Sequence, residues 1–501
     1  MSLRSYLLGS VAIGSALAMA APAMAQSNGA VNAQIQALQD QLRAVNQQLQ
    51  NLQGQVIQTQ QSQAQATATV NQLKAAPALS SNGVVVTMPN NRPTFSTADG
   101  ANTLAITGRL NFDIGAYDYH PGSTFSAPQA LHSGVNARRA RLGVTGKFLN
   151  DWGYNLIFDL GGSTDSGANT VLENAYITYN GIAPFHFDLG YQDVPFTLDE
   201  ATSSNDIMFM ERSSAQVIAA NLAAGDNRSA FGARWNNDRA WVGIYGTGPA
   251  ANTTHGIPEQ FGATARATYQ VLQDANYSFH IGGNVEGLIK PPTTANVRSV
   301  TSFSDRPELR VDPTSIINTG AIGTATNPVK DASVFGAELA GGLGSAFAQA
   351  EYFHYNVTRQ GLSALNFNGG YVQGSYTITG ESRKYNPSTG AYGTIVPNNP
   401  FSWKSGTWGA WEAAARFSVV DLNDLFTPGT TTASTNGVAG GKQTVYTVGL
   451  NWYPNTNMRF MLNVLHGDIN KKQGAVVAGS PLGSNIGASF NAVALRSQFN
   501  F

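Results

Sequence analysis

The feature that most constrains this chain is an alternation of apolar and polar residues over stretches of about ten residues, repeated up to the last residue. In the first stretch Leu110, Phe112 and Ile114 alternate with Asn111 and Asp113. The same rhythm recurs in residues 139–147, 185–192, 411–419, 459–464 and 493–501. Strands of soluble proteins are usually about five residues long, whereas a tilted strand needs about ten to cross a membrane. The pattern therefore predicts strands that lie between lipid and water.

A soluble β-sandwich also alternates, so composition has to separate the two classes. Only 12% of the residues are charged, and the mean hydropathy is -0.16. Charge is depleted without long apolar runs, which favours a barrel with an uncharged outer band. Aromatic residues gather at strand ends, as interfacial girdles do: Tyr117, Tyr119, Trp152, Trp452 and Tyr453. We predict an all-β, antiparallel transmembrane barrel over residues 101–501, with about 16 strands at roughly 25 residues per strand and connection.

Residues 1–25 have the pattern of a secretory signal peptide. Arg4 precedes an apolar stretch that runs from Tyr6 to Ala20, and the segment ends in Ala23-Met24-Ala25. Cleavage is expected before Gln26. The alternative is an uncleaved anchor, but the stretch is shorter than the roughly 20 residues of a spanning helix. Secretion and a barrel together predict a location in the bacterial outer membrane.

Residues 26–76 are predicted to form an α-helical coiled coil in the periplasm. Apolar residues recur at steps of three and four: Ile35, Leu38, Leu42, Val45, Leu49, Leu52, Val56, Ala66, Val70 and Leu73. A heptad seam is buried only against other helices. At 1.5 Å per residue the stalk would reach roughly 60 Å. A single amphipathic helix lying on the barrel is the alternative. Residues 77–100, with Pro89 and Pro93, are expected to be a linker.

The strand pattern places seven basic residues on the polar face, because a charge facing lipid costs roughly 2–4 kcal/mol. They come from the first two and the last three or so strands, which meet at the closing seam: Arg109, Arg139, Arg141, Lys147, Arg416, Arg459 and Arg496. The acids expected to face them are fewer: Asp113, Asp159, Asp188 and Glu412. Guanidinium groups favour phosphate and carboxylate, so we predict an anion-preferring pore. The alternative is that these charges only hydrate and brace the wall.

Residues 194–227 are too long for a turn and too apolar for a solvated loop. We expect this segment either to fold into the barrel as a constriction, with Glu211, Arg212 and Arg228 near the path, or to form an outer cap or trimer contact. Four long polar stretches are predicted to be extracellular loops: 119–134, 291–331, 378–405 and 427–441. Short turns are predicted to be periplasmic.

Other functional classes find little support. A net charge of -1 argues against nucleic-acid binding, which needs a basic surface. There is no cysteine, the seven histidines show no metal-ligand spacing, and no serine lies in a nucleophile elbow. We therefore predict neither an enzyme, nor a metal site, nor a cofactor.

Several motifs resemble the phosphate-selective porin O and P family. They are Gly108-Arg109-Leu110, Arg139-Ala140-Arg141-Leu142-Gly143, Gln192-Asp193-Val194-Pro195-Phe196, Gly380-Glu381-Ser382-Arg383-Lys384-Tyr385, the segment from Gly409 to Phe417, Gly440-Gly441, the segment from Gly449 to Asn455, and Arg496-Ser497-Gln498-Phe499. The resemblance implies a homotrimer of 16-stranded barrels, each with an inward loop and an arginine-rich route for phosphate or polyphosphate. The family's arginines in the first two strands carry over to Arg109, Arg139 and Arg141. Asn155 stands where a lysine would suit a central anion site, so strict phosphate selectivity is not implied.

The leading hypothesis is passive diffusion of small hydrophilic solutes and ions, mainly anions, through a pore surrounded by outer-membrane lipid. The second is a structural role, in which the stalk tethers the outer membrane to peptidoglycan or another periplasmic partner and the pore is secondary.

Overall fold

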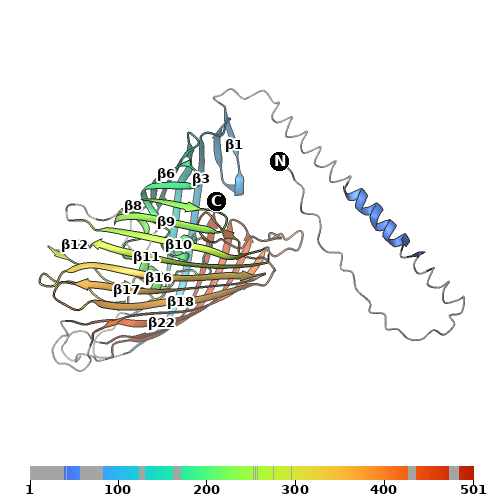
Figure 1. The fold of residues 1–501 in the computed structure, drawn as a ribbon. Helices are drawn as coiled ribbons and strands as arrows, with labels where there is room; N and C mark the ends of the chain where they lie inside the picture. The colour runs from blue at the N-terminus through green and yellow to red at the C-terminus, as the bar shows by residue number, and fades with distance from the viewer. Residues whose placement is uncertain are drawn as a thin grey trace, which may run out of the picture. The chain divides into compact units, whose positions relative to one another are not determined.

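Sixteen antiparallel strands close into a barrel in the computed structural model, which describes residues 36, 39–40, 42–56, 83–122, 130–161, 171–251, 253, 256, 258–274, 276–294, 296–426, 436–472 and 485–501. The barrel strands are β3 Thr103–Pro121, β4 Gly134–Phe148, β5 Trp152–Asp159, β6 Val171–Ile182, β7 Phe185–Val194, β8 Gly225–Asn236, β9 Ala240–Ala250, β10 Phe261–Gln273, β11 Tyr277–Lys290, β16 Val329–Leu343, β17 Ala346–Arg359, β18 Leu365–Thr377, β21 Ala410–Asp424, β22 Val438–Asn455, β23 Met458–Asn470 and β24 Ala488–Asn500 (Figure 1). Each pairs with its neighbours, and β24 pairs with β3. The predicted fold class is confirmed.

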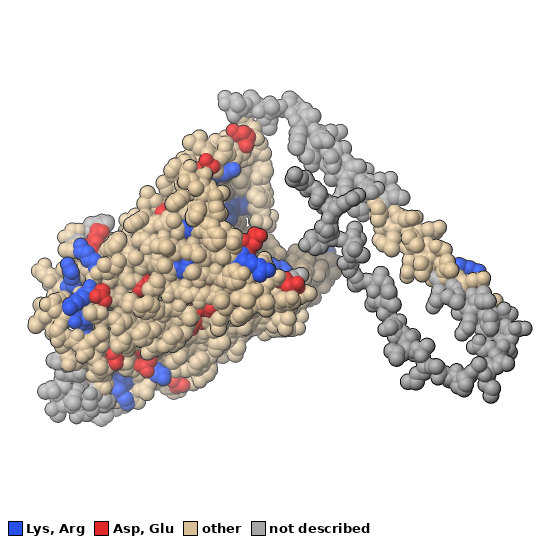
Figure 2. Space-filling view, viewed as in Figure 1, with Lys and Arg blue, Asp and Glu red and all other residues tan. Residues whose placement is uncertain are grey.

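The period-2 pattern decides which side chains face outward. Leu110 and Leu495 are 47% and 52% exposed, whereas Asp113 and Arg496 on the opposite face are buried. Figure 2 shows the visible outer wall mostly without charge, with Lys, Arg, Asp and Glu gathered mainly toward the strand ends. The outer face is thus suited to hydrocarbon, and the polar groups are enclosed.

The region expected as a linker contains a small hairpin. Strands β1 Val84–Thr87 and β2 Thr94–Thr97 flank the 3₁₀ turn Pro89–Asn91, and β2 pairs with the start of β3. The last strand, β24, leaves this place open because it ends opposite Arg109. The hairpin therefore extends the sheet at the end of the barrel where the chain also terminates.

The chain divides into two compact units, residues 1–79 and 80–501. In the first, residues 42–56 are helical, and the apolar stripe of Leu42, Val45, Leu49, Leu52 and Val56 is 51–63% exposed. The helix agrees with part of the predicted stalk, while a coiled coil needs further chains. The predicted signal peptide and the remaining heptads lie outside the described residues. No helix in the described ranges is long and apolar enough to span a membrane.

One predicted extracellular loop was wrong. Strand direction puts residues 378–409, which follow β18, at the end that also carries the turns 149–151, 237–239 and 456–457 and the C-terminus. The reason is that β17 and β18 are joined by only five residues, 360–364, so the long connection falls at the other end. The described parts of 119–134, 291–331 and 427–441 lie at the end opposite those turns.

Residues 378–409 also fold inward. The short strands β19 Tyr385–Asn386 and β20 Ala391–Tyr392 bring the loop against the wall, where the Arg383 guanidinium binds the Glu412 carboxylate at 2.8 Å. Arg266 of β10 donates to the Gly390 carbonyl at 2.7 Å. From the opposite end, residues 291–328, with β12 Thr293–Thr294, β13 Val297–Arg298, β14 Ser304–Asp305 and β15 Ile317–Asn318, enter as well. Phe303 packs on Tyr355 and Phe367 of the wall, so the apolar core is inside the barrel.

Candidate functional site: the interior of the barrel

The segment between β7 and β8 crosses the inside of the barrel. It contains α2 Leu198–Ala201 and α3 Ser214–Asn221, and the stretch from Ile207 to Ala220 is almost wholly buried. Side chains of the wall donate to its carbonyl groups: Arg459 to Ile207 at 2.7 Å, Asn451 to Met208 at 2.8 Å and Arg416 to Glu211 at 2.8 Å. Of the two expected positions, the structure places this inward segment within the lumen.

Three carboxylates hold backbone N–H groups of the inward segment. Glu351 of β17 accepts from Leu198 and Asp199 at 2.7 and 3.1 Å, at the start of α2. Glu308 accepts from Ser214 at 3.0 Å, at the start of α3, and Glu286 accepts from Ala223 just beyond its end. N–H groups at the first turn of a helix have no partner within the helix, so a buried carboxylate there both satisfies them and fixes the helix.

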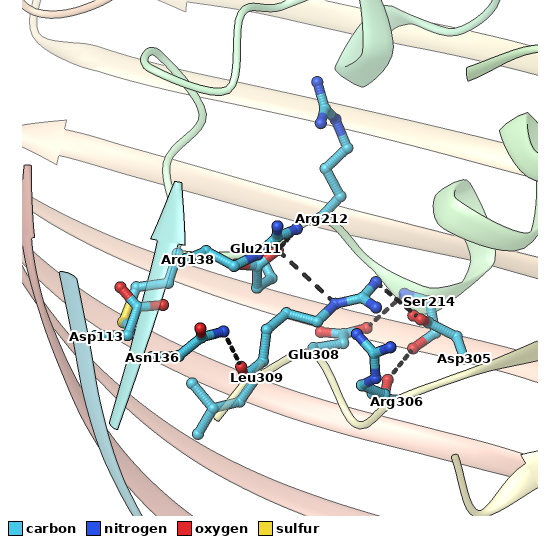
Figure 3. A network of polar contacts seen from close by, with 12 residues as sticks. Asp113, Asn136, Arg138, Glu211, Arg212, Ser214, Asp305, Arg306, Glu308 and Leu309 are labelled. Carbon is cyan, nitrogen blue, oxygen red and sulfur yellow. Dashed lines mark hydrogen bonds and ion pairs between the residues drawn. The ribbon is translucent and has the colours of Figure 1, made fainter. Parts of the chain in front are cut away.

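Glu211 is the centre of a charged cluster on the inward segment (Figure 3). Its carboxylate contacts Arg138 at 2.9 Å and Arg496 at 2.7 Å, with Arg310 at 3.9 Å. Burial raises the pKa of Glu211, but the neighbouring guanidinium groups outweigh burial and hold this pKa well below its usual value of 4.5. The cluster therefore keeps a carboxylate charged in the interior.

The other two predicted residues of the constriction lie elsewhere. Arg212 points away from the Glu211 cluster in Figure 3 and donates to the carbonyls of Asp199 and Thr202 at 3.1 and 3.0 Å. Arg228 donates to carbonyls at the end of α3 and on β9, the shortest bond being 2.7 Å to Ala224. Both arginines brace the inward segment and also line the cavity beside it.

The arginines predicted on the strands face inward, and three of the six bind carboxylates. Arg496 binds Asp113, Arg416 binds Glu308, and Arg141 binds both Asp159 and Glu173, all at 2.6–2.9 Å. More acids face these arginines than predicted, because Glu173 of β6 was missed and the connecting segments supply Glu308 and the predicted constriction residue Glu211. Unpaired buried charges are costly, so the interior is a mixed ionic network.

The other four predicted basic residues lie in more varied surroundings. Arg459 donates to Gln498 at 2.8 Å, and Arg109 donates to Ser204. Arg139 is 2% exposed, and its Nε and Nη1 have no hydrogen-bond partner among the described residues. Lys147 lies near the end of β4, half-buried, opposite Thr103.

Sequence reasoning missed several arginines of the interior, and four of them lie where alternation gives no guidance. Arg138 should face lipid by strict alternation, but a β-bulge opposite Asn111 and Asp113 shifts the register and turns it inward. Arg306 and Arg310 belong to the segment predicted as an extracellular loop. Arg92 comes from the predicted linker. A bulge and the course of a loop leave no period-2 signal, so the pattern could not identify these residues.

Two cavities flank the inward segment. The first, about 440 Å³, lies on the side of the long loops and is lined by five carboxylates and by seven arginines, namely Arg138, Arg139, Arg141, Arg212, Arg228, Arg306 and Arg310. The second, about 460 Å³, lies at the end of the short turns. Its described lining contains Arg92, Arg109 and Arg141 and no Asp or Glu side chain. Arg141 lines both cavities, so one side chain connects the two ends of the interior.

The described residues contain no group of three or more His, Asp or Glu arranged to bind a metal ion.

The sequence model of the family "Phosphate-selective porin O and P" matches residues 104–501. The curated Porin O of Pseudomonas aeruginosa is 26% identical over 381 residues, which cover 72% of this chain and 82% of that protein.

Among solved structures, the anion-selective porin from Comamonas acidovorans covers 80% of this chain and 100% of its own, with 10% identity and a TM-score of 0.48. The trimer form of OmpT from Vibrio cholerae covers the same shares, with 14% identity and a TM-score of 0.47.

Proposed function

The chain belongs to the phosphate-selective porin O and P family, and we propose that its barrel lets small hydrophilic anions diffuse passively across the outer membrane. Family and fold point to a channel rather than an enzyme. The proposed preference for anions rests on the arginines of the interior.

The observation that supports anion preference is the lining of the two cavities. Seven arginines face five acidic side chains in the first, and three arginines face no Asp or Glu side chain in the described lining of the second. An ion that crosses from one cavity to the other passes Arg141, which lines both. Fixed positive charge in a confined space of low dielectric raises the local concentration of anions. The predicted residues Arg109 and Arg141 belong to this route, and we propose that Arg139 adds to its field.

The test is the reversal potential of the full chain in planar bilayers under a KCl gradient, with and without added phosphate. Arg92 is the best position to neutralise, because its side chain donates to the Thr145 hydroxyl at 3.4 Å and its loss leaves no carboxylate unpaired in the described part of the chain. Arg92→Gln should shift the reversal potential toward cation preference. Arg239→Gln, in the exposed turn 237–239, is the matched control and should leave it unchanged. Cation selectivity of the unmodified protein would refute the proposal.

We further propose the domain plan of a signal peptide (1–25), a coiled-coil stalk (26–76), a linker (77–100) and a barrel (101–501), assembled as a homotrimer. The exposed apolar stripe of helix 42–56 supports self-association, since such a seam is stable only when it is covered. Deleting residues 26–76 separates the pore from a tethering role through peptidoglycan. Unchanged conductance with a detached envelope would support tethering, whereas loss of trimers alone would support an assembly role.

A further inference from the structure

Residues 401–408 form a small aromatic hairpin at the end of the barrel that carries the short turns. Ser402 and Thr407 exchange backbone hydrogen bonds of 3.0 and 3.2 Å, and Gly406, with a φ of +68°, lies within the turn. Trp403 and Trp408 are 79% and 56% exposed. Two indole rings this exposed at one site are unusual on a surface that meets only water.

The aromatic hairpin packs on the outside of the barrel wall. Phe401 lies edge-on to Trp452, 5.5 Å between ring centroids, and the Trp452 indole N–H donates to the Trp408 carbonyl at 2.7 Å. Trp452 alternates with Asn451 and Tyr453, whose side chains reach Glu412 inside the barrel, so Trp452 faces outward.

The hairpin is continuous with the band of the barrel that faces lipid. Trp452 stacks on Trp411 at 5.6 Å and on Phe460 at 5.4 Å, and both of these rings belong to the outward face of their strands. The hairpin thus extends an aromatic girdle beyond the strand ends. Tryptophan is favoured at this depth, where the ring is apolar and the N–H meets water or headgroups.

We propose that the aromatic hairpin 401–408 binds the phospholipid headgroup region of the inner leaflet. Lys404 stands between the two tryptophans, and an ammonium group at this level attracts anionic headgroups. The same loop enters the lumen through the Arg383–Glu412 ion pair. Lipid binding therefore holds the outer part of a loop whose inner part fills the barrel.

The experiment measures the depth of a spin label. The chain has no cysteine, so Lys404→Cys gives one labelling site and keeps both tryptophans. The labelled full chain is placed in nanodiscs of phosphatidylethanolamine and phosphatidylglycerol, and its collisions with oxygen and with a water-soluble nickel chelate are compared. The control is Asp238→Cys in the exposed turn 237–239 at the same end of the barrel.

The ratio of oxygen to nickel accessibility should be several-fold higher at position 404 than at position 238. Trp403→Ser/Trp408→Ser, made together with Lys404→Cys, should bring the ratio down to that of the control. Equal ratios at 404 and 238 with the tryptophans present would overturn the proposal. So would low accessibility to both reagents with broadening between labels, since that result indicates a second copy as the partner. Conductance measured on the same sample distinguishes a failure of this proposal from a failure of the pore.

Discussion

Replacing Arg496 by methionine should destabilise the barrel more than any exposed substitution, because this side chain joins three parts of the fold. It binds both Asp113 oxygens at 2.7 Å across the β24–β3 seam and the Glu211 carboxylate at 2.7 Å on the inward segment. The side chains of Arg496 and Asp113 are 0% exposed. Breaking a buried pair by removing one partner costs about 3–5 kcal/mol, since the other charge stays uncompensated.

The contacts that remain after the change show which carboxylate, Glu211 or Asp113, accounts for most of this cost. Glu211 keeps Arg138 at 2.9 Å after the change, whereas Asp113 loses the guanidinium group that binds both of its oxygens. Most of the loss should therefore come from Asp113. The double variant Arg496→Met/Asp113→Leu leaves no charge at the seam and should recover most of the stability, because apolar pairs often replace buried ion pairs at little cost.

The assay is urea unfolding in lipid vesicles, followed by tryptophan fluorescence and linear extrapolation. Arg239→Gln, in the exposed turn, should stay within about 0.5 kcal/mol of the unmodified protein. If Arg496→Met lies within about 1 kcal/mol of it, or if the double variant is no more stable than the single one, the seam does not depend on this pair as argued.

Three further changes follow from the same contacts. Glu351→Ala removes the acceptor for the N–H groups of Leu198 and Asp199 and should destabilise the inward segment by roughly 1–3 kcal/mol. Hydrogen exchange in residues 195–224 should then speed up by about 10-fold or more, while exchange in the wall strands stays unchanged. In urea unfolding, Gly409→Ala should cost about 1–3 kcal/mol more stability than Gly380→Ala. Both glycines have positive φ, but a Cβ at 409 would lie 2.3 Å from the Tyr453 carbonyl oxygen, whereas a Cβ at 380 meets nothing. Folding lowers the pKa of Glu211, so the contribution of this carboxylate to stability is fully present above pH 4.5 and is lost as the pH falls through the folded pKa. The stability of the protein relative to Glu211→Gln should therefore be constant from about pH 7 to 5. A decline in that range would contradict the proposed charged cluster.

The sequence predicted the parts of this fold that have a two-residue period. Alternation places Arg496 inside and Leu495 outside wherever the strand crosses the membrane, because a charge on the lipid face is too costly. The same argument placed the strand residues Arg109, Arg141, Arg416 and Arg459 on the inward face. The strand number followed from length, and closure followed from the amphipathic last strand.

Connections between strands carry no such period, and there the predictions were weaker. Loop length was used to assign the two ends of the barrel. However, the short connection 360–364 lies at the end of the long loops, so the long connection 378–409 lies at the end of the short turns. Whether a long segment turns inward depends on partners far away in sequence. Glu351 and Glu308, which cap α2 and α3, lie more than 90 residues from the helices that they hold.

The charge balance of the interior is also set by these connections, and that changes how selectivity should be understood. Counting strand residues predicted a basic wall, but three of its six arginines, Arg141, Arg416 and Arg496, bind acids, among them Glu173, Glu308 and Glu211. The two ends differ in the excess of positive over negative side chains that remains after pairing. This excess is largest where Arg92 joins Arg109 in a described lining without Asp or Glu side chains. Arg92 precedes the residues that match the family, 104–501. If Arg92→Gln shifts the reversal potential as proposed, the segment before the barrel contributes to the ion selectivity of the pore, which the strand pattern alone does not predict.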